Sequence, residues 1–296
     1  MLHVLYMSMR DKAYYSVRTG KNQLSKGFGL NQLRTLFQNV FSKFDDEGYF
    51  QESLGYFCVD ADHVPGTLGH NLEGVLLLKL RKDNLAPIHV KIAGYSEDDL
   101  FDVIEFLYEH CSKQVDGYFH SYANCGMHYH TFDRMPGRQE FREKVNEILS
   151  VYEGGFELSS NGEILHIAET GMEGLFEAAL PTTDSNNISS RVDAARIKFR
   201  RHGASLDDRR DAIRELADVL EYLRPELKTV LTKGDELDLF NIANNFGIRH
   251  HNKNQKTDYD RPIWYSWMFY YYLASIHAAL RLIEKKQVGE DAHRAK

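Results

Sequence analysis

Cysteine is scarce in this chain, with only Cys58, Cys111 and Cys125 among 296 residues. An odd and scattered set argues against a disulfide framework of the kind that stabilises small secreted domains, and it favours a reducing compartment. Residues 1–6 also lack the basic region and long apolar run of a signal peptide. We therefore expect a cytoplasmic protein.

Long apolar runs are missing as well. The stretch that most resembles a membrane span, residues 263–283, contains Ser266, Ser275, His277 and Arg281. Polar and charged groups are costly inside a bilayer, so we expect a buried helix there and no membrane contact. The sequence also has no Gly-rich Walker loop and no Gly-x-Ser-x-Gly elbow, so nucleotide hydrolysis and acyl transfer have no support.

The composition is that of a globular protein with a real core, because 43% of the residues are hydrophobic and 27% are charged. The formal net charge is −7. A surface with this balance does not attract nucleic acid as a whole, so any polyanion site must be a local basic patch.

The pattern of turns divides the chain near Pro181. Before this point, turn residues break the sequence into short pieces that predict an α+β N-terminal module, residues 1–180. Its amphipathic stretches 30–44, 97–112 and 139–153 predict helices, and residues 156–167 predict a β-hairpin with a primed turn at Asn161-Gly162. The polar residues 181–187 predict a linker.

Helical periodicity dominates the rest of the chain and predicts an all-α bundle over residues 188–286. The basic stretch 188–202 forms the first helix. Ser205 and Asp208 predict a capping box that opens the next helix, which stops before Pro225. A short helix at 226–231, one at 235–246 and one from Pro262 to about residue 286 complete the bundle. Residues 287–296 are expected to form a flexible tail.

The densest polar block in the sequence, residues 241–255, lies between the last two helices. It contains Arg249, His250, His251 and several amides. Buried polar groups cost free energy when they are unpaired, so stability alone rarely requires so many together. Arginine offers a fixed cation for phosphate, and histidine titrates near neutral pH. The block is therefore the first candidate site, although the same residues also suit a purely structural role at a helix junction.

Two segments around this block, residues 235–251 and 264–277, resemble the C-terminal helical region of bacterial abortive-infection proteins. Such regions look like HEPN domains, which are small helical bundles in RNA-cleaving and phage-defence proteins. Residues 141–149, the Gly154-Gly155 turn and the following hairpin are similar to the module that precedes these domains. The resemblance implies an α+β N-terminal module followed by an all-α HEPN-like helical bundle, an antiviral defence role and a homodimer formed through the helical domain.

The resemblance also implies site residues. Arg249, His250 and His251 would be catalytic in a metal-independent endoribonuclease, with Arg249 on the phosphate and one histidine as general base or acid. The residues expected to bind RNA are Asn245, Asn252, Lys253 and Gln255. We expect no cofactor and assign no metal ligand. One departure from the family pattern is that the downstream histidine is missing, because the expected window holds Lys253, Asn254 and Gln255.

Other interpretations stay open. A degenerate HEPN bundle would bind RNA or a protein without cleaving. A metal-dependent hydrolase would use the loop 117–137, where His120, Cys125, His128 and His130 lie near Asp133, although no paired-cysteine spacing accompanies them. The arginines of 188–202 either contact a polyanion or pair with acidic residues such as Asp207 and Glu215. The aromatic stretch 264–272 fits a core or dimer interface better than a surface for base stacking.

Overall fold

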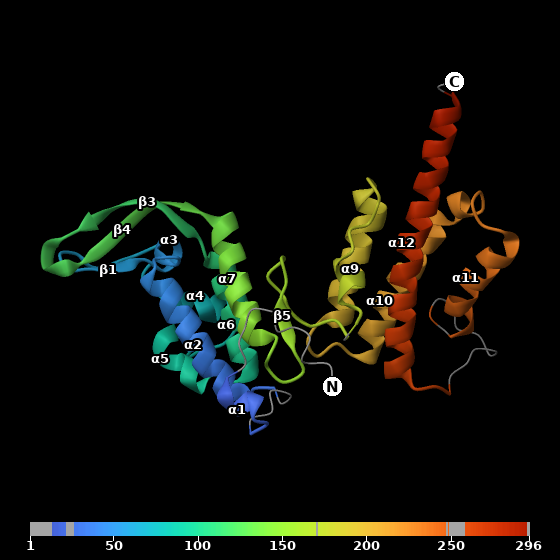
Figure 1. Ribbon diagram of the computed structural model, residues 1–296. Helices are drawn as coiled ribbons and strands as arrows, with labels where there is room; N and C mark the ends of the chain where they lie inside the picture. Colours follow the sequence, from blue (N-terminus) through green and yellow to red (C-terminus); the bar gives the residue numbers. More distant parts are fainter. Residues whose placement is uncertain (1–13, 22–26, 170, 247, 249–257, 295–296) are drawn as a thin grey trace. The chain divides into compact units, whose positions relative to one another are not determined.

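The computed structural model describes residues 14–21, 27–169, 171–246, 248 and 258–294. It divides into two compact units, Met1–His166 and Ile167–Lys296, which are described separately (Figure 1). The N-terminal unit mixes helices with small antiparallel sheets, and the described part of the C-terminal unit is helical. Among the helices of the described residues, none is both long enough and apolar enough to cross a bilayer.

Helices α2 (Leu30–Asp46), α4 (Leu72–Leu80), α6 (Glu97–His110) and α7 (Arg134–Leu149) surround the core of the N-terminal unit. Shorter helical pieces are α1 (Tyr15–Arg18), α3 (Gln51–Leu54), α5 (Ile88–Lys91) and η1 (Ile92–Gly94). A capping box between Ser96 and Asp99 starts α6. Its buried residues Leu100, Ile104 and Leu107 recur at helical spacing. The expected helices 30–44, 97–112 and 139–153 are thus present, although α7 begins five residues earlier than predicted.

Aromatic rings fill the centre of this core. Phe141 of α7 meets Phe44 and Phe50 edge to face, with ring centroids 5.3 Å and 5.9 Å away. Phe141 and Phe50 are fully buried. Each such ring stabilises the fold by about 1.5–3 kcal/mol through removal of apolar surface from water.

Two hairpins lie outside this core. Strands β1 (Tyr56–Cys58) and β2 (Asp62–Val64) form the first, and β3 (Lys113–His120) and β4 (Gly126–Asp133) form the second. We call the second hairpin, residues 113–133, the β3–β4 arm (green in Figure 1). The fully buried core cluster includes none of the described residues between Cys111 and Phe141. The arm is therefore held by something other than the hydrophobic core.

A third hairpin, β5 (Phe156–Leu158) with β6 (Ile164–His166), confirms the hairpin expected at 156–167. Its turn differs from the prediction. The Gly162 N–H bonds to the Ser159 carbonyl, and Gly162 has a φ of +86°, whereas Asn161 does not have a positive φ. A type I′ turn needs a positive φ at both central residues and a type II′ turn needs one at the first, so this is a non-primed turn followed by a left-handed glycine.

The C-terminal unit contains α8 (Glu173–Glu177), the π-helical turn η3 (Ser185–Ser189), α9 (Ser190–Arg200), α10 (Leu206–Leu227), α11 (Lys233–Asn245) and α12 (Arg261–Arg294). The expected capping box of Ser205 and Asp208 opens α10. Helix α10 packs against both α9 and α12. Phe269 of α12 stacks on Phe199 of α9, with ring centroids 4.0 Å apart.

Several predicted boundaries shift in this unit. Helix α10 includes Pro225 and ends at Leu227, because a proline in the last turn disrupts little of the helix that precedes it. Of the helix predicted at 226–231, only residues 226 and 227 are helical, as the end of α10, and residues 228–230 form a turn. Helix α12 continues to Arg294 instead of fraying after residue 286, since a single glycine costs a helix only about 1 kcal/mol and no proline follows it before Arg294.

The division between the units also lies earlier than the linker expected at 181–187. Phe176 is buried in the C-terminal core, where it stacks on Phe269 with ring centroids 5.6 Å apart. The Tyr270 hydroxyl accepts a hydrogen bond from the Glu169 N–H at 3.0 Å. Residues from Ile167 onward therefore belong with the helices that follow them.

Candidate metal centre

Most of the site residues predicted for RNA chemistry lie outside the described residues: Arg249, His250, His251, Asn252, Lys253 and Gln255. Asn245 is described, and it is the exposed last residue of α11. Phe246, inside the polar block, contacts residues that follow the block. Phe246 stacks on Trp264 with ring centroids 5.2 Å apart, and its carbonyl accepts a hydrogen bond from the Tyr259 hydroxyl at 3.0 Å.

The basic helix α9 uses several of its arginines inside its own unit. Arg191 pairs with Glu215 at 3.1 Å, as the acidic-pairing interpretation expects. Arg196 binds Asp193 and the carbonyls of Leu175 and Ala178. Burial lowers the pKa of the Arg196 guanidinium, which fits a structural role better than contact with an exposed polyanion.

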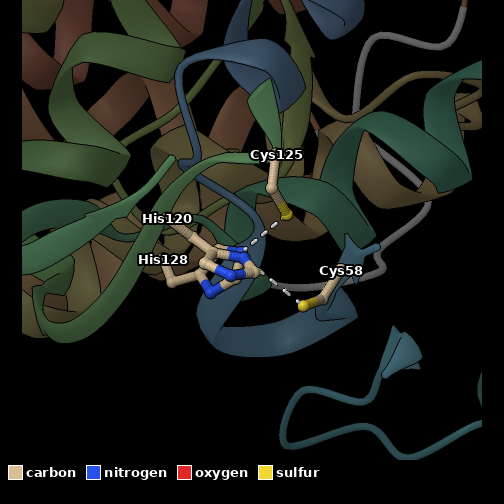
Figure 2. Close-up of side chains that lie close together, drawn as sticks. All are labelled: Cys58, His120, Cys125 and His128. Atoms are coloured by element: carbon tan, nitrogen blue, oxygen red, sulfur yellow. Dashed lines mark hydrogen bonds between the residues drawn. The ribbon is translucent and has the colours of Figure 1, made fainter. Parts of the chain in front are cut away.

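The N-terminal unit brings together a different group of side chains. Cys58, His120, Cys125 and His128 converge at the end of the β3–β4 arm (Figure 2). Each offers one sulfur or nitrogen atom, and these four atoms all lie within 4.8 Å of one another. Cysteine and histidine are the ligands that zinc prefers in structural sites.

Strand register explains how three of these residues meet. In the β3–β4 ladder, His120 pairs with Gly126 and Tyr118 pairs with His128. Residues two apart in a strand share a face, so His120 and His128 are diagonal neighbours on one face of the arm. Their ring centroids are 5.2 Å apart. Cys125 ends the connection between the two strands, next to the short turn η2 (Tyr122–Asn124).

Cys58 comes from the other hairpin, as the last residue of β1. Its Sγ lies 3.8 Å from Nδ1 of His120, and the Sγ of Cys125 lies 3.2 Å from Nε2 of His128. With metal–ligand bonds of normal zinc length, the edges of a tetrahedron measure roughly 3.3–3.8 Å. The two sulfur–nitrogen distances are close to this range, so small side-chain rotations complete a tetrahedral cage.

Each imidazole is oriented by a hydrogen bond on its other nitrogen. Nε2 of His120 lies 3.2 Å from the Asp60 carboxylate, and Nδ1 of His128 lies 3.1 Å from the Tyr118 hydroxyl. This arrangement fixes which nitrogen faces the sulfurs, as the outer partners of metal-binding histidines do. Burial and, next, the neighbouring His120 lower the pKa of His128. The neutral imidazole that results is the form that binds a metal ion.

The environment of the four side chains is enclosed on one side and open on the other. Cys58 and His128 are buried, whereas Cys125 and His120 are partly exposed. The Tyr56 ring packs on His128 with centroids 4.4 Å apart. An ion could enter from the side of Cys125 and would then be shielded by aromatic rings.

Two residues that the sequence grouped with this cluster have other roles. His130 is exposed, and its Nδ1 lies 3.1 Å from the Thr131 hydroxyl. Asp133 caps α7 by accepting a hydrogen bond from the Met135 N–H. Cys58, by contrast, was missed, because it is 62 residues before His120 and only the fold brings the two hairpins together. The spacing Cys125-x-x-His128 was the one local signal. The assignment of no metal ligand is therefore replaced by a four-residue candidate.

The chemistry of this donor set is that of a closed site. Structural zinc sites have four protein ligands, whereas hydrolytic sites have three and leave the fourth position for water. Here two thiolates and two imidazoles supply all four positions. The geometry thus favours structural metal binding over the metal-dependent hydrolase considered from the sequence.

Comparisons of the chain with known protein families, with curated proteins and with solved structures found no match.

Proposed function

We propose that the N-terminal unit is a zinc-binding module, in which Cys58, His120, Cys125 and His128 hold one structural Zn²⁺. The ion would tie the end of the β3–β4 arm to the β1–β2 hairpin. When bound, it would supply four short bonds that link the two hairpins. The observation that carries the proposal is the convergence of these four donor atoms within 4.8 Å.

The position of the cluster supports a stabilising role. An isolated two-stranded hairpin is marginally stable in water, and the β3–β4 arm contributes nothing to the fully buried core. Its base is held by Lys113, which binds Glu140 of α7 at 2.6 Å. Nearer the tip, the Gln51 amide accepts from the Tyr129 N–H and donates to the Met127 carbonyl, both at 3.1 Å. The candidate site is at the opposite end of the arm from Lys113, and its ligand His128 lies between Met127 and Tyr129. Structural zinc binding contributes on the order of 10–16 kcal/mol in small domains, which is ample to order such a segment.

Metal analysis of the full chain tests this proposal. We expect one zinc per chain by mass spectrometry of the metals, and the d–d and thiolate charge-transfer absorption of a tetrahedral site after exchange into Co²⁺. His128→Ala removes a buried ligand and should abolish both signals. The matched control is His130→Ala, two residues along the same strand and outside the cluster. Zinc that survives in the His128→Ala chain, or an absence of zinc in the natural chain, contradicts the proposal.

A second candidate function belongs to the C-terminal unit, for which we propose action on RNA as a homodimer in an abortive-infection role. The contacts of Phe246 with Trp264 and Tyr259 support it, because they bring residues on either side of Arg249 and His250 in the sequence close together. Arg249 and His250 would then act on a phosphodiester, with His251 as the alternative proton-transfer group. The RNA contacts would come from Asn245, Asn252, Lys253 and Gln255.

An exposed stripe on α12 supports self-association. The residues of the stripe recur every three or four positions and are exposed or partly exposed: Trp264, Trp267, Tyr271, Ala274, Ala278 and Leu282. Such spacing places them on one face of the helix. Large rings at one end and small alanines in the middle allow a second helix to approach closely. A cytoplasmic homodimer through this stripe is the arrangement we propose.

Two experiments separate these ideas. Cleavage of total RNA in excess chelator, lost in both Arg249→Ala and His250→Ala, supports a metal-independent nuclease. Binding without cleavage, weakened steeply by salt, supports the non-catalytic alternative.

For the dimer, Ala274→Glu places a charge in the stripe and should give a monomer by light scattering. Gln287→Glu adds the same charge elsewhere on α12 and should leave a dimer. A natural chain that is already monomeric contradicts the dimer.

A further inference from the structure

The candidate zinc site contains two cysteines from different hairpins, and this pairing has a chemical consequence. The sulfurs of Cys58 and Cys125 both belong to the group whose donor atoms lie within 4.8 Å. A disulfide needs a sulfur–sulfur distance of about 2.05 Å. The two sulfurs therefore have to move towards each other from a separation within 4.8 Å, and the bond that forms takes both of them away from the ion.

The two cysteines differ in access. Cys58 is 7% exposed, whereas Cys125 lies at the partly exposed end of the arm. An oxidant from solvent therefore reaches Cys125 first, and Cys58 is placed to react with the product. Reactive cysteines with an adjacent second thiol are the ones that form disulfides after oxidation.

The third cysteine is separated from this chemistry. Cys111 is fully buried in the core, and its thiol lies 3.4 Å from the Gly137 carbonyl. Burial raises the pKa of the Cys111 thiol, so it is kept as an unreactive thiol. Oxidation would therefore be confined to the other two cysteines.

We infer that Cys58 and Cys125 form a peroxide-sensitive pair whose oxidation to a disulfide releases the zinc ion. This inference rests on the proposed zinc site. The Cys125 thiolate attacks hydrogen peroxide, which yields a sulfenic acid and hydroxide. The Cys58 thiolate then attacks that sulfur, the S–S bond forms and a second hydroxide leaves. Two thiolates lose two electrons, the peroxide is reduced to two hydroxides that take up protons as water, and Zn²⁺ departs from the two remaining imidazoles.

The consequence is a change in how the arm is held. In the zinc form, four ligands fix both strands of the arm to β1. In the disulfide form, one covalent link joins Cys58 to Cys125, and His120 and His128 are free of the ion. The end of the arm would become more mobile while the helical core stays folded, since the arm lies outside that core.

Zinc release from the full-length zinc-loaded chain tests the inference. Hydrogen peroxide is added in the presence of a chromogenic zinc chelator, and the disulfide is mapped by peptide mass spectrometry. We expect one equivalent of zinc to appear together with a Cys58–Cys125 disulfide, and reductant plus Zn²⁺ to restore the starting state. Cys111→Ala should behave like the natural chain.

The decisive variant is Cys125→His, which keeps four zinc-type ligands and removes the accessible thiol. It should retain zinc and release it at least ~10-fold more slowly under peroxide, because no disulfide can form. If the natural chain binds zinc and peroxide leaves it in place, or yields a disulfide that involves Cys111, the redox inference fails and the zinc proposal stands. If the natural chain binds no zinc, both fail.

Discussion

The helical core of the N-terminal unit and its β3–β4 arm are stabilised in opposite ways. The core buries rings such as Phe37, Phe50 and Phe141 completely. The arm exposes much of its surface, including Tyr118 and Phe119, which are 57% and 58% exposed. Its polar contacts include the Lys113–Glu140 ion pair at its base, and the Gln51 amide together with the candidate metal ligands nearer its tip. Apolar burial is spread over many residues, whereas the order of the arm depends on a few polar atoms.

Loss of the metal ion should give the largest effect, and this effect should be confined to the arm. Replacement Cys58→Ser should lower the free energy of opening of the arm towards zero, because the ion's contribution is lost. Hydrogen exchange should show lost amide protection across residues 113–133. Amides of α2 and α6 should keep their protection. If these amides exchanged as fast as those of the arm, core and arm would not be stabilised separately.

A core substitution should lower the stability of the helical core and leave zinc binding intact. Phe141→Ala removes a fully buried ring between Phe44 and Phe50, which costs about 3–5 kcal/mol of unfolding free energy. Chemical denaturation followed by circular dichroism measures this loss. The folded variant should still bind one zinc per chain, since the four ligands come from the two hairpins. Loss of zinc binding from a folded Phe141→Ala chain would show that core and arm are not independent.

A smaller effect is expected from the hydrogen bonds on either side of His128. Gln51→Ala removes two hydrogen bonds to the β4 backbone, at Met127 and Tyr129. Opening of the neighbouring amides should become easier by about 1–2 kcal/mol. Gln139→Ala, on the exposed surface of α7, is the control. Equal exchange in both variants would mean that Gln51 does not anchor the arm.

The smallest effect is a pH dependence at the junction between core and arm. Hydrogen bonds from Lys113, at 2.6 Å, and from Tyr49 lower the pKa of Glu140. A carboxyl group with a lowered folded-state pKa stabilises the fold above its unfolded pKa, and that contribution is lost as pH falls through the folded value. Stability measured by denaturation should therefore fall in the acid range below about pH 4.3. Glu140→Gln should flatten that dependence, and Glu143→Gln, exposed on the same helix, should leave it unchanged.

Local patterns were sufficient for the regular elements. Helical spacing predicted α2 and α6, and Ser205 with Asp208 predicted the start of α10, because capping and periodicity act within a few residues. The hairpin at residues 156–167 was equally local. One prediction failed where long-range packing decides, because Phe176 joins the C-terminal core. The end of α12 was placed too early for a local reason, since Gly289 does not stop the helix.

The candidate site illustrates the same limit. The sequence by itself determined a three-cysteine chain, a helical C-terminal region and the pair Cys125 and His128, three residues apart. Only the tertiary structure decided that Cys58 joins them and that His130 does not. The physical reason is that a metal site needs donor atoms a few ångströms apart, and strand register and hairpin packing set that distance. Neither is encoded in the spacing of the ligands along the chain.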